Sequence, residues 1–218
     1  MSTPEFATTP AKRNRQRSLY LVIAGVIILV TIIAVWIIAN GRLPFMPPRL
    51  NGIAIQSPEP AQNFTLTSQT GQPLSLTDLR GKVVLLYFGY TYCPDACPTT
   101  LAELKKATQT LGGDAEDVQV VMVSIDPERD TPEVLKTYMA YFDPSYIGLT
   151  GTEDEILAAA TPYGVYFQKH EGSPATGYLV DHTTTVMAID KEGYLRLFYP
   201  YGTAGEDIAA DLRYLVND

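Results

Sequence analysis

The sequence predicts an α/β fold in which a mixed β-sheet is flanked by helices and preceded by one membrane-spanning helix near the N-terminus. Continuous apolar runs at 83–88 and 120–125 are typical of strands buried on both faces of a sheet, and a segment with helical spacing separates them. Further strands alternate with helices before a terminal hairpin, the order expected for a mixed sheet. A long uncharged run near the N-terminus indicates the membrane helix.

The uncharged run covers residues 19–39, close to the ~20 residues that a helix needs to cross the hydrocarbon layer of a membrane. The apolar core of a cleaved signal peptide is shorter and is followed by a small-residue cleavage site, so we expect an uncleaved anchor. Residues 1–18 form a basic tail with four positive charges between Lys12 and Arg17. By the positive-inside rule this tail is cytoplasmic, and the C-terminal bulk is extracytoplasmic.

Charge and ligand counts exclude several classes of protein. Residues 1–40 carry a net charge of +3 and residues 41–218 carry −11, within a total of −8. An acidic domain of this kind repels nucleic acid. The chain has only two cysteines and two histidines, too few for zinc fingers, iron–sulfur clusters or multi-disulfide frameworks.

Five prolines between residues 40 and 62 predict a semi-rigid stalk, so we expect the folded domain to span 63–218. Apolar residues on both sides of Ser68–Gly71 predict a hairpin at the start of this domain. The strand at 83–88, a helix over 97–111 and the strand at 120–125 then form a β-α-β unit.

The second half of the domain begins with a helix capped by Thr131 that runs from Pro132 to Phe142. The charged loop before it, 126–130, is expected to form ion pairs and caps. The remaining elements are a helix at 153–160, strands at 165–170, 184–190 and 194–199, and an amphipathic C-terminal helix through Ile208, Leu212 and Leu215.

The two cysteines, Cys93 and Cys97, lie where the strand at 83–88 meets its helix, the place where ligands collect in open α/β sheets. If both lie in the first helical turn, their spacing puts the sulfurs on one face, and the helix N-terminus favours thiolates. Such a pair serves either soft-metal binding or thiol–disulfide exchange, although exchange usually uses two intervening residues instead of three. Two thiolates with one imidazole suit copper, whereas structural zinc prefers four ligands.

The imidazole is expected from His182, which immediately precedes the predicted core strand at 184–190 next to the cysteines. His170 lies in a polar segment and is interpreted as a solvated loop residue.

Several further side chains are expected around the ligands. Asp181 is a candidate to orient the ring of His182, and Asp95 lies between the cysteines. Tyr90 and Tyr92 are candidate walls of the site, whereas Tyr87 is assigned to the core.

With these residues in view, the sequence resembles the Sco/SenC family of membrane-anchored copper chaperones. Three segments carry the resemblance: GKVVLLYFGYTYCPDACP at 81–98, SIDPERDTP at 124–132 and VDHT at 180–183. The first and third are highly specific together. Thr183 replaces the serine that the family commonly has after its histidine.

The resemblance implies a thioredoxin-like fold in which Cys93, Cys97 and His182 bind copper, as Cu(I) or Cu(II). It further implies that the protein delivers copper to the dinuclear copper site of cytochrome c oxidase subunit II during assembly. Other copper chaperones are implied as partners, and the cell membrane as the location of a single-pass protein.

Two alternatives stay open. The first is an extracytoplasmic thiol–disulfide oxidoreductase that keeps the oxidase subunit cysteines reduced. Against it, residues 180–189 lack the proline that thioredoxin-type reductases place opposite their cysteines, and Tyr90 stands where peroxiredoxins have threonine. The second alternative is a copper or redox sensor that signals to a membrane complex.

Overall fold

A computed structural model describes residues 10–40, 49–172 and 177–217 of the chain. The chain divides into two units, Met1–Arg49 and Leu50–Asp218. Residues 1–9 of the predicted tail and 41–48 of the predicted stalk lie outside the described residues.

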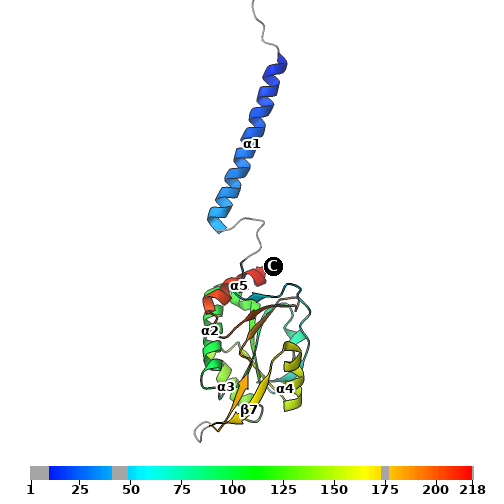
Figure 1. Cartoon of the computed structure of the whole chain (residues 1–218), viewed down its shortest axis with the longest axis vertical. Helices are drawn as coiled ribbons and strands as arrows, with labels where there is room; N and C mark the ends of the chain where they lie inside the picture. The colour runs from blue at the N-terminus through cyan, green and yellow to red at the C-terminus, as the bar shows by residue number, and fades with distance from the viewer. Residues whose placement is uncertain (1–9, 41–48, 173–176, 218) are drawn as a thin grey trace, which may run out of the picture. The chain divides into compact units, whose positions relative to one another are not determined.

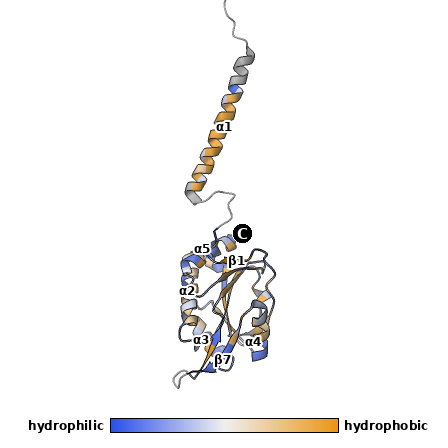
Figure 2. Cartoon of the chain, in the orientation of Figure 1, coloured by the Kyte–Doolittle hydropathy of each residue, from blue (hydrophilic) through white to orange (hydrophobic). Residues whose placement is uncertain are grey.

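The first unit contains one long helix, α1 (Pro10–Asn40). Its segment Arg17–Ile37 has a mean hydropathy of 2.9, and none of it is buried against the protein. The apolar colouring runs along the middle of the helix in Figure 2. The helix is therefore long and apolar enough to cross a membrane, in agreement with the anchor predicted at 19–39.

The second unit is built on an eight-stranded mixed sheet with the strand order β1-β10-β9-β4-β5-β6-β2-β3. Its strands are β1 (Ile53–Ala54), β2 (Thr65–Ser68), β3 (Pro73–Ser75), β4 (Val83–Gly89), β5 (Val118–Ser124), β6 (Ile147–Thr150), β9 (Val186–Ile189) and β10 (Leu195–Tyr199). The central strands β4 and β5 are parallel, and every residue in them is buried. This burial explains their continuous apolar sequences.

Helices cover both faces of this sheet. They are α2 (Ala96–Leu111), α3 (Pro132–Phe142), α4 (Glu153–Ala160) and α5 (Gly205–Asn217). Figure 1 shows α2, α3 and α5 on one face and α4 on the other. The predicted cap of α3 is confirmed, because the Thr131 hydroxyl accepts a hydrogen bond from the amide of Val134 at 3.4 Å. The predicted end of the helix at residue 111 is also confirmed, since α2 ends at Leu111 and a 3₁₀ turn begins at Gly112.

A separate two-stranded antiparallel sheet lies at one end of the domain (Figure 1). It consists of β7 (Phe167–Glu171) and β8 (Tyr178–His182). The predicted strand at 165–170 corresponds to β7, whereas β8 was not predicted. We call residues 167–182 the β7–β8 hairpin; its residues 173–176 lie outside the described ones.

Strand β6, which lies between α3 and α4 in the chain, was also not predicted from the sequence. This strand is only four residues long and contains a glycine, so its pattern is weak. The glycine has a packing reason: a Cβ on Gly148 would lie 3.0 Å from the Cβ of Leu135 and 3.1 Å from the Cγ of Met139. Close approach of α3 to the sheet therefore requires glycine here.

The folded unit begins at Leu50, earlier than the predicted start of the domain at Asn63. Residues 53 and 54 form β1, paired with β10. The carboxylate of Asp211 accepts hydrogen bonds from the backbone amides of Asn51 at 2.9 Å and Gly52 at 2.8 Å. Residues 50–62, assigned to the stalk from sequence, thus begin with a segment that pairs with the sheet and α5.

Candidate metal centre

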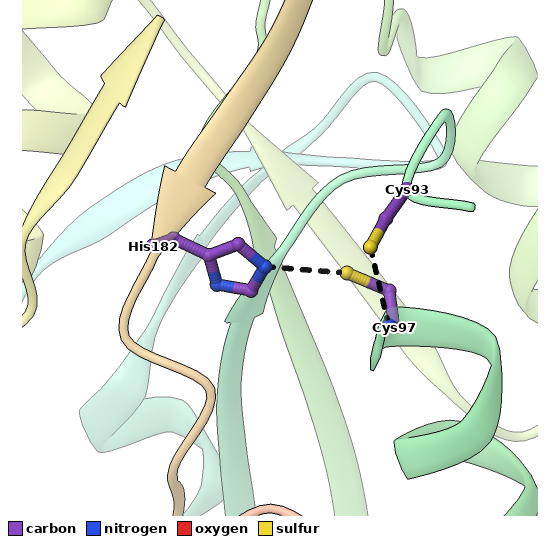
Figure 3. A group of neighbouring side chains, drawn as sticks. All are labelled: Cys93, Cys97 and His182. Carbon is purple, nitrogen blue, oxygen red and sulfur yellow. Dashed lines mark hydrogen bonds between the residues drawn. The ribbon is translucent and has the colours of Figure 1, made fainter. Parts of the chain in front are cut away.

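The two cysteines lie at the carboxyl end of β4. Cys97 is in the first turn of α2 and is fully buried, whereas Cys93 precedes the helix and is half-buried. The expectation that both lie in the helical turn is therefore correct only for Cys97. The backbone amide of Cys97 points at the Cys93 sulfur, with N and Sγ 3.4 Å apart (Figure 3).

Gly89, the last residue of β4, makes room for this arrangement. A Cβ at this position would lie 3.0 Å from the Cys97 sulfur and 2.6 Å from the ring of Tyr87. Any larger residue would push the sulfur or the ring out of place.

The third group, His182, is the last residue of β8, and its ring is directed at the start of α2 (Figure 3). Its Nε2 lies 3.6 Å from the Cys97 sulfur, and its Nδ1 lies 3.0 Å from the carbonyl oxygen of Thr183. Because a carbonyl oxygen only accepts hydrogen bonds, the neutral ring carries its proton on Nδ1. The lone pair of Nε2 then faces the sulfurs, which is the form that binds a metal.

The three side chains fit one soft metal ion. One sulfur from each cysteine and one nitrogen of His182 lie within 4.8 Å of one another. With metal bonds of about 2.0–2.3 Å to nitrogen and sulfur, two ligands of one ion are at most ~4.6 Å apart. The site therefore needs only a small contraction to coordinate an ion. Within the described part of the chain, no other group of three potential ligands has this spacing.

The two thiols differ strongly in acidity. A hydrogen bond from Cys97, supported by hydrogen bonds from the backbone amides of Asp95 and Cys97, lowers the pKa of Cys93 to about 3. The same hydrogen bond to Cys93, together with burial, raises the pKa of Cys97. At neutral pH the pair is thus one thiolate and one thiol. A metal ion that binds both sulfurs must displace the proton of Cys97.

Two tyrosines enclose the site on the side of β4. Tyr90 is buried, and its ring centroid lies 5.8 Å from that of His182 at an interplanar angle of 81°. Tyr87 is also buried, and its hydroxyl donates a hydrogen bond to the Cys97 sulfur at 3.4 Å. The sequence assigned Tyr87 to core packing alone. The available signal was its place inside an apolar strand, since a buried tyrosine hydroxyl needs a partner.

The other predicted neighbours lie elsewhere. Tyr92 is 58% exposed, and its ring stacks near the guanidinium of Arg129, 4.7 Å from centroid to Cζ. The Asp181 side chain is 79% exposed and lies 3.3 Å from Nδ1 of His170. Successive residues of a strand point to opposite faces, so Asp181 turns away from the face of His182. His170, interpreted as a solvated residue at the end of the predicted strand 165–170, lies in β7, and its side chain is 43% exposed.

A thiolate, a thiol and an imidazole at the carboxyl end of a central strand define this protein as a thioredoxin-like domain with a soft-metal or thiol-exchange centre. The family model described as SCO1/SenC matches residues 54–217, and the chain belongs to this family.

Solved structures agree with this assignment. Apo Sco1 from Thermus thermophilus is 43% identical, with a TM-score of 0.69 over 77% of this chain and 97% of that one. Copper-bound ScoI from Bradyrhizobium japonicum is 38% identical, with a TM-score of 0.66 over 72% of this chain and 99% of that one. BsSco, a member of the Sco family of cytochrome c oxidase assembly proteins with a disulfide switch, is 26% identical, with a TM-score of 0.57 over 75% of this chain and 98% of that one.

Proposed function

We propose that this protein is a membrane-anchored copper chaperone that delivers copper to the dinuclear copper site of cytochrome c oxidase subunit II. The observation that carries the proposal is the convergence of the sulfurs of Cys93 and Cys97 with Nε2 of His182. Copper binding in the 38% identical ScoI and the membership of BsSco in a family of oxidase assembly proteins support it.

In this mechanism copper moves by ligand exchange. The buried sulfur of Cys97 and Nε2 of His182 hold the ion from inside, and the half-buried sulfur of Cys93 holds it from the solvent side. A thiolate of the receiving subunit binds the ion from that side and displaces Cys93, the better leaving group because its thiolate is the more stable. Release of Cys97 follows, and its sulfur recovers the proton that copper had displaced.

The anchor places this chemistry at a membrane surface. We infer that the basic tail stays in the cytoplasm and that the domain from Leu50 onward lies outside, as the positive-inside rule requires. Protease is added to cells whose outer layers have been removed but whose cytoplasmic membrane is intact; it should digest the domain but spare the tail. Digestion of the tail alone would show that the orientation is the opposite one.

Copper titration of the full chain in detergent tests the metal site. We expect the wild type to bind one copper ion and Cys93→Ser/Cys97→Ser to bind none. His182→Ala should lose the nitrogen ligand in X-ray absorption spectra, whereas His170→Ala, the matched control on the same hairpin, should keep it. Equal copper binding by the wild type and the double cysteine variant would refute the proposal.

A second candidate function is reduction of a partner's disulfide, favoured by the low pKa of Cys93. Here the Cys93 thiolate attacks the disulfide, Cys97 resolves the mixed disulfide, and the pair ends oxidised while the partner gains two thiols. This activity does not need an imidazole ligand. Reduction of one equivalent of a disulfide substrate by the reduced pair that survives His182→Ala, with copper transfer lost, would therefore favour the reductase.

A further inference from the structure

We propose that Arg129 is a positioning residue for His182: it ties the β7–β8 hairpin to the loop that carries Cys93, and thereby brings the imidazole to the sulfurs. This inference rests on the proposed function insofar as His182 is treated as a copper ligand. Its structural half, that Arg129 holds the hairpin in place, does not depend on copper.

The hairpin needs such a tie because it is a separate sheet. In the described part of the chain, β7 and β8 pair with each other and not with the eight-stranded sheet. The hairpin is joined to the loops around the site through side chains: the amide of Val180 donates to the Tyr90 hydroxyl at 3.3 Å, and the Tyr178 hydroxyl donates to Asp126. His182 pairs with Phe167 inside the hairpin, but its position relative to the sulfurs depends on these side-chain contacts and on the short connection to β9, and not on pairing of β8 with the eight-stranded sheet.

Arg129 contacts all three segments that meet here. Its Nε pairs with the carboxylate of Asp126, whose side chain is fully buried in the loop after β5. Its Nη1 donates to the carbonyl oxygen of Tyr178 on β8 at 3.0 Å. Its Cζ lies 3.7 Å from the ring centroid of Tyr178 and 4.7 Å from that of Tyr92, next to Cys93. A planar guanidinium can pair with a carboxylate and stack on rings at once, which a lysine ammonium cannot do.

The contact with Tyr178 bears on His182 through the strand. Tyr178, Val180 and His182 alternate along β8, so their side chains lie on the same face. Arg129 fixes the first of these residues, and Tyr90 contacts the second and packs against the ring of the third. Loosening the first contact therefore lets the strand move away from the sulfurs at its far end.

A second cation reaches the same ring but is more exposed. Lys169 lies 5.4 Å from the Tyr178 ring centroid and pairs with Glu128 at 2.9 Å. The side chains of this pair are 29% and 63% exposed, against 17% for Arg129 and 0% for Asp126. Exposed ion pairs are weak, so the Lys169–Glu128 pair adds little to the hold on the hairpin, and the more buried Arg129 holds it through its contacts with Tyr178.

The test compares Arg129→Met and Arg129→Lys with the wild type and with Arg213→Met, each as the full chain in detergent. Arg213 is a matched control because its guanidinium bonds a carbonyl oxygen, that of Thr110 on α2, away from the hairpin. Hydrogen exchange of the β8 amides without metal should be faster in Arg129→Met than in the control, while β4 and β5 stay protected. Tyr178→Phe, which keeps the ring and loses only the hydroxyl, should show a smaller increase.

With copper alone as the probe, Arg129→Met should bind about 10–100-fold more weakly than the wild type and lose the nitrogen component of the X-ray absorption spectrum. Arg129→Lys should fall between the two, because it keeps the charge without the planar fork. In a His182→Ala background, Arg129→Met should cost nothing further, since it acts through His182.

Three results would overturn the inference: unchanged exchange of β8, a retained nitrogen ligand in Arg129→Met, or an equal loss of affinity in the His182→Ala background. If the wild type binds no copper while β8 exchange still rises in Arg129→Met, the proposed function fails and the structural tie stands. If the wild type binds copper and β8 exchange does not change, the tie fails and the copper site stands.

Discussion

Cys93 and Cys97 act as a pair with one proton, and their different surroundings decide which sulfur keeps it. Cys93 faces solvent on one side and accepts hydrogen bonds from the amides at the start of α2, so its charge is stabilised. Cys97 is enclosed by Tyr87 and Tyr90, and burial disfavours its charge. The half-buried sulfur of Cys93 is thus the more reactive of the two, and the buried sulfur of Cys97 is the less reactive.

Alkylation at different pH values tests this division. Because the pKa of Cys93 is lowered to about 3, its thiolate persists at pH 5, and iodoacetamide should modify it at nearly the same rate at pH 5 and pH 8. Cys97 should remain unmodified in the folded protein. Peptide mass spectrometry after timed alkylation gives both rates. A rate at Cys93 that rises tenfold per pH unit would show an ordinary thiol.

The same asymmetry predicts how stability depends on pH. The folded-state pKa of Cys93 lies below its unfolded value, so between about pH 3 and pH 9 the unfolded chain binds a proton that the folded chain does not. The thiolate therefore stabilises the fold above that range, and its contribution is lost as pH falls. We expect the difference in free energy of unfolding between wild type and Cys93→Ser to grow from pH 5 to pH 8 in urea titrations. A constant difference would contradict this.

Tyr87 contributes through its hydroxyl, which donates a hydrogen bond to the Cys97 sulfur at 3.4 Å inside the core. Tyr87→Phe keeps the ring and removes this hydrogen bond, so we expect a loss of about 1 kcal/mol in the free energy of unfolding. Denaturant titration measures it. Tyr141→Phe is the control, because Tyr141 is 80% exposed and should show no change. Equal effects of the two substitutions would argue against a role for the Tyr87 hydroxyl.

At the scale of elements, Asp130 joins the loops that follow β4 and β5. Its buried carboxylate accepts hydrogen bonds from the hydroxyl of Ser124 at 2.6 Å and from the amide of Thr91 at 3.0 Å. Asp130→Ala leaves these donors unsatisfied and should cost about 2–3 kcal/mol of stability, with Asp130→Asn costing less. The exposed Asp154 supplies the control substitution Asp154→Ala. Denaturation midpoints equal to that control would mean that the junction is dispensable.

Elements with local signals could be predicted from the sequence, and those that depend on distant partners could not. Thr131 and Pro132 predict the start of helix α3, and the unbroken apolar run predicts strand β4. In contrast, the two residues of β1 are a strand only because they pair with β10, nearly 150 positions away: Ile53 lies opposite Phe198. No periodicity can be read from so short a segment.

The candidate site also has parts that could be predicted from the sequence and parts that could not. The cysteine pair lies within one short motif. His182, which is 85 positions from Cys97, could be predicted from its place before a core strand, and the family resemblance implies the same ligand. The tie between Arg129 and Tyr178 was not visible, because it forms only when the hairpin folds over the loop after β5. The charged loop was expected to form ion pairs within itself, and Arg129 and Asp126 form such a pair. Glu128 of the same loop pairs instead with Lys169 of the hairpin.

At the scale of the whole molecule, the segment after the anchor is part of the domain. Asp211 is 1% exposed, and its carboxylate accepts hydrogen bonds from the backbone amides of Asn51 and Gly52. The same segment supplies β1 to the edge of the sheet. The folded unit thus begins at Leu50 and includes residues that the sequence assigned to the stalk.

Two soluble fragments test this boundary, residues 50–218 and residues 63–218. The shorter fragment leaves Asp211 as a buried carboxylate without the amides of Asn51 and Gly52, and it leaves β10 without β1 on its outer side, so we expect it to be less stable by about 3 kcal/mol. For a domain of this size the loss corresponds to a melting temperature lower by about 6–12 °C. Asp211→Ala should reproduce most of the loss in the longer fragment and add little in the shorter one, because both changes remove the same hydrogen bonds. If the two fragments melt at the same temperature, residues 50–62 contribute no stability, and the stalk extends through residue 62 as the sequence alone predicts.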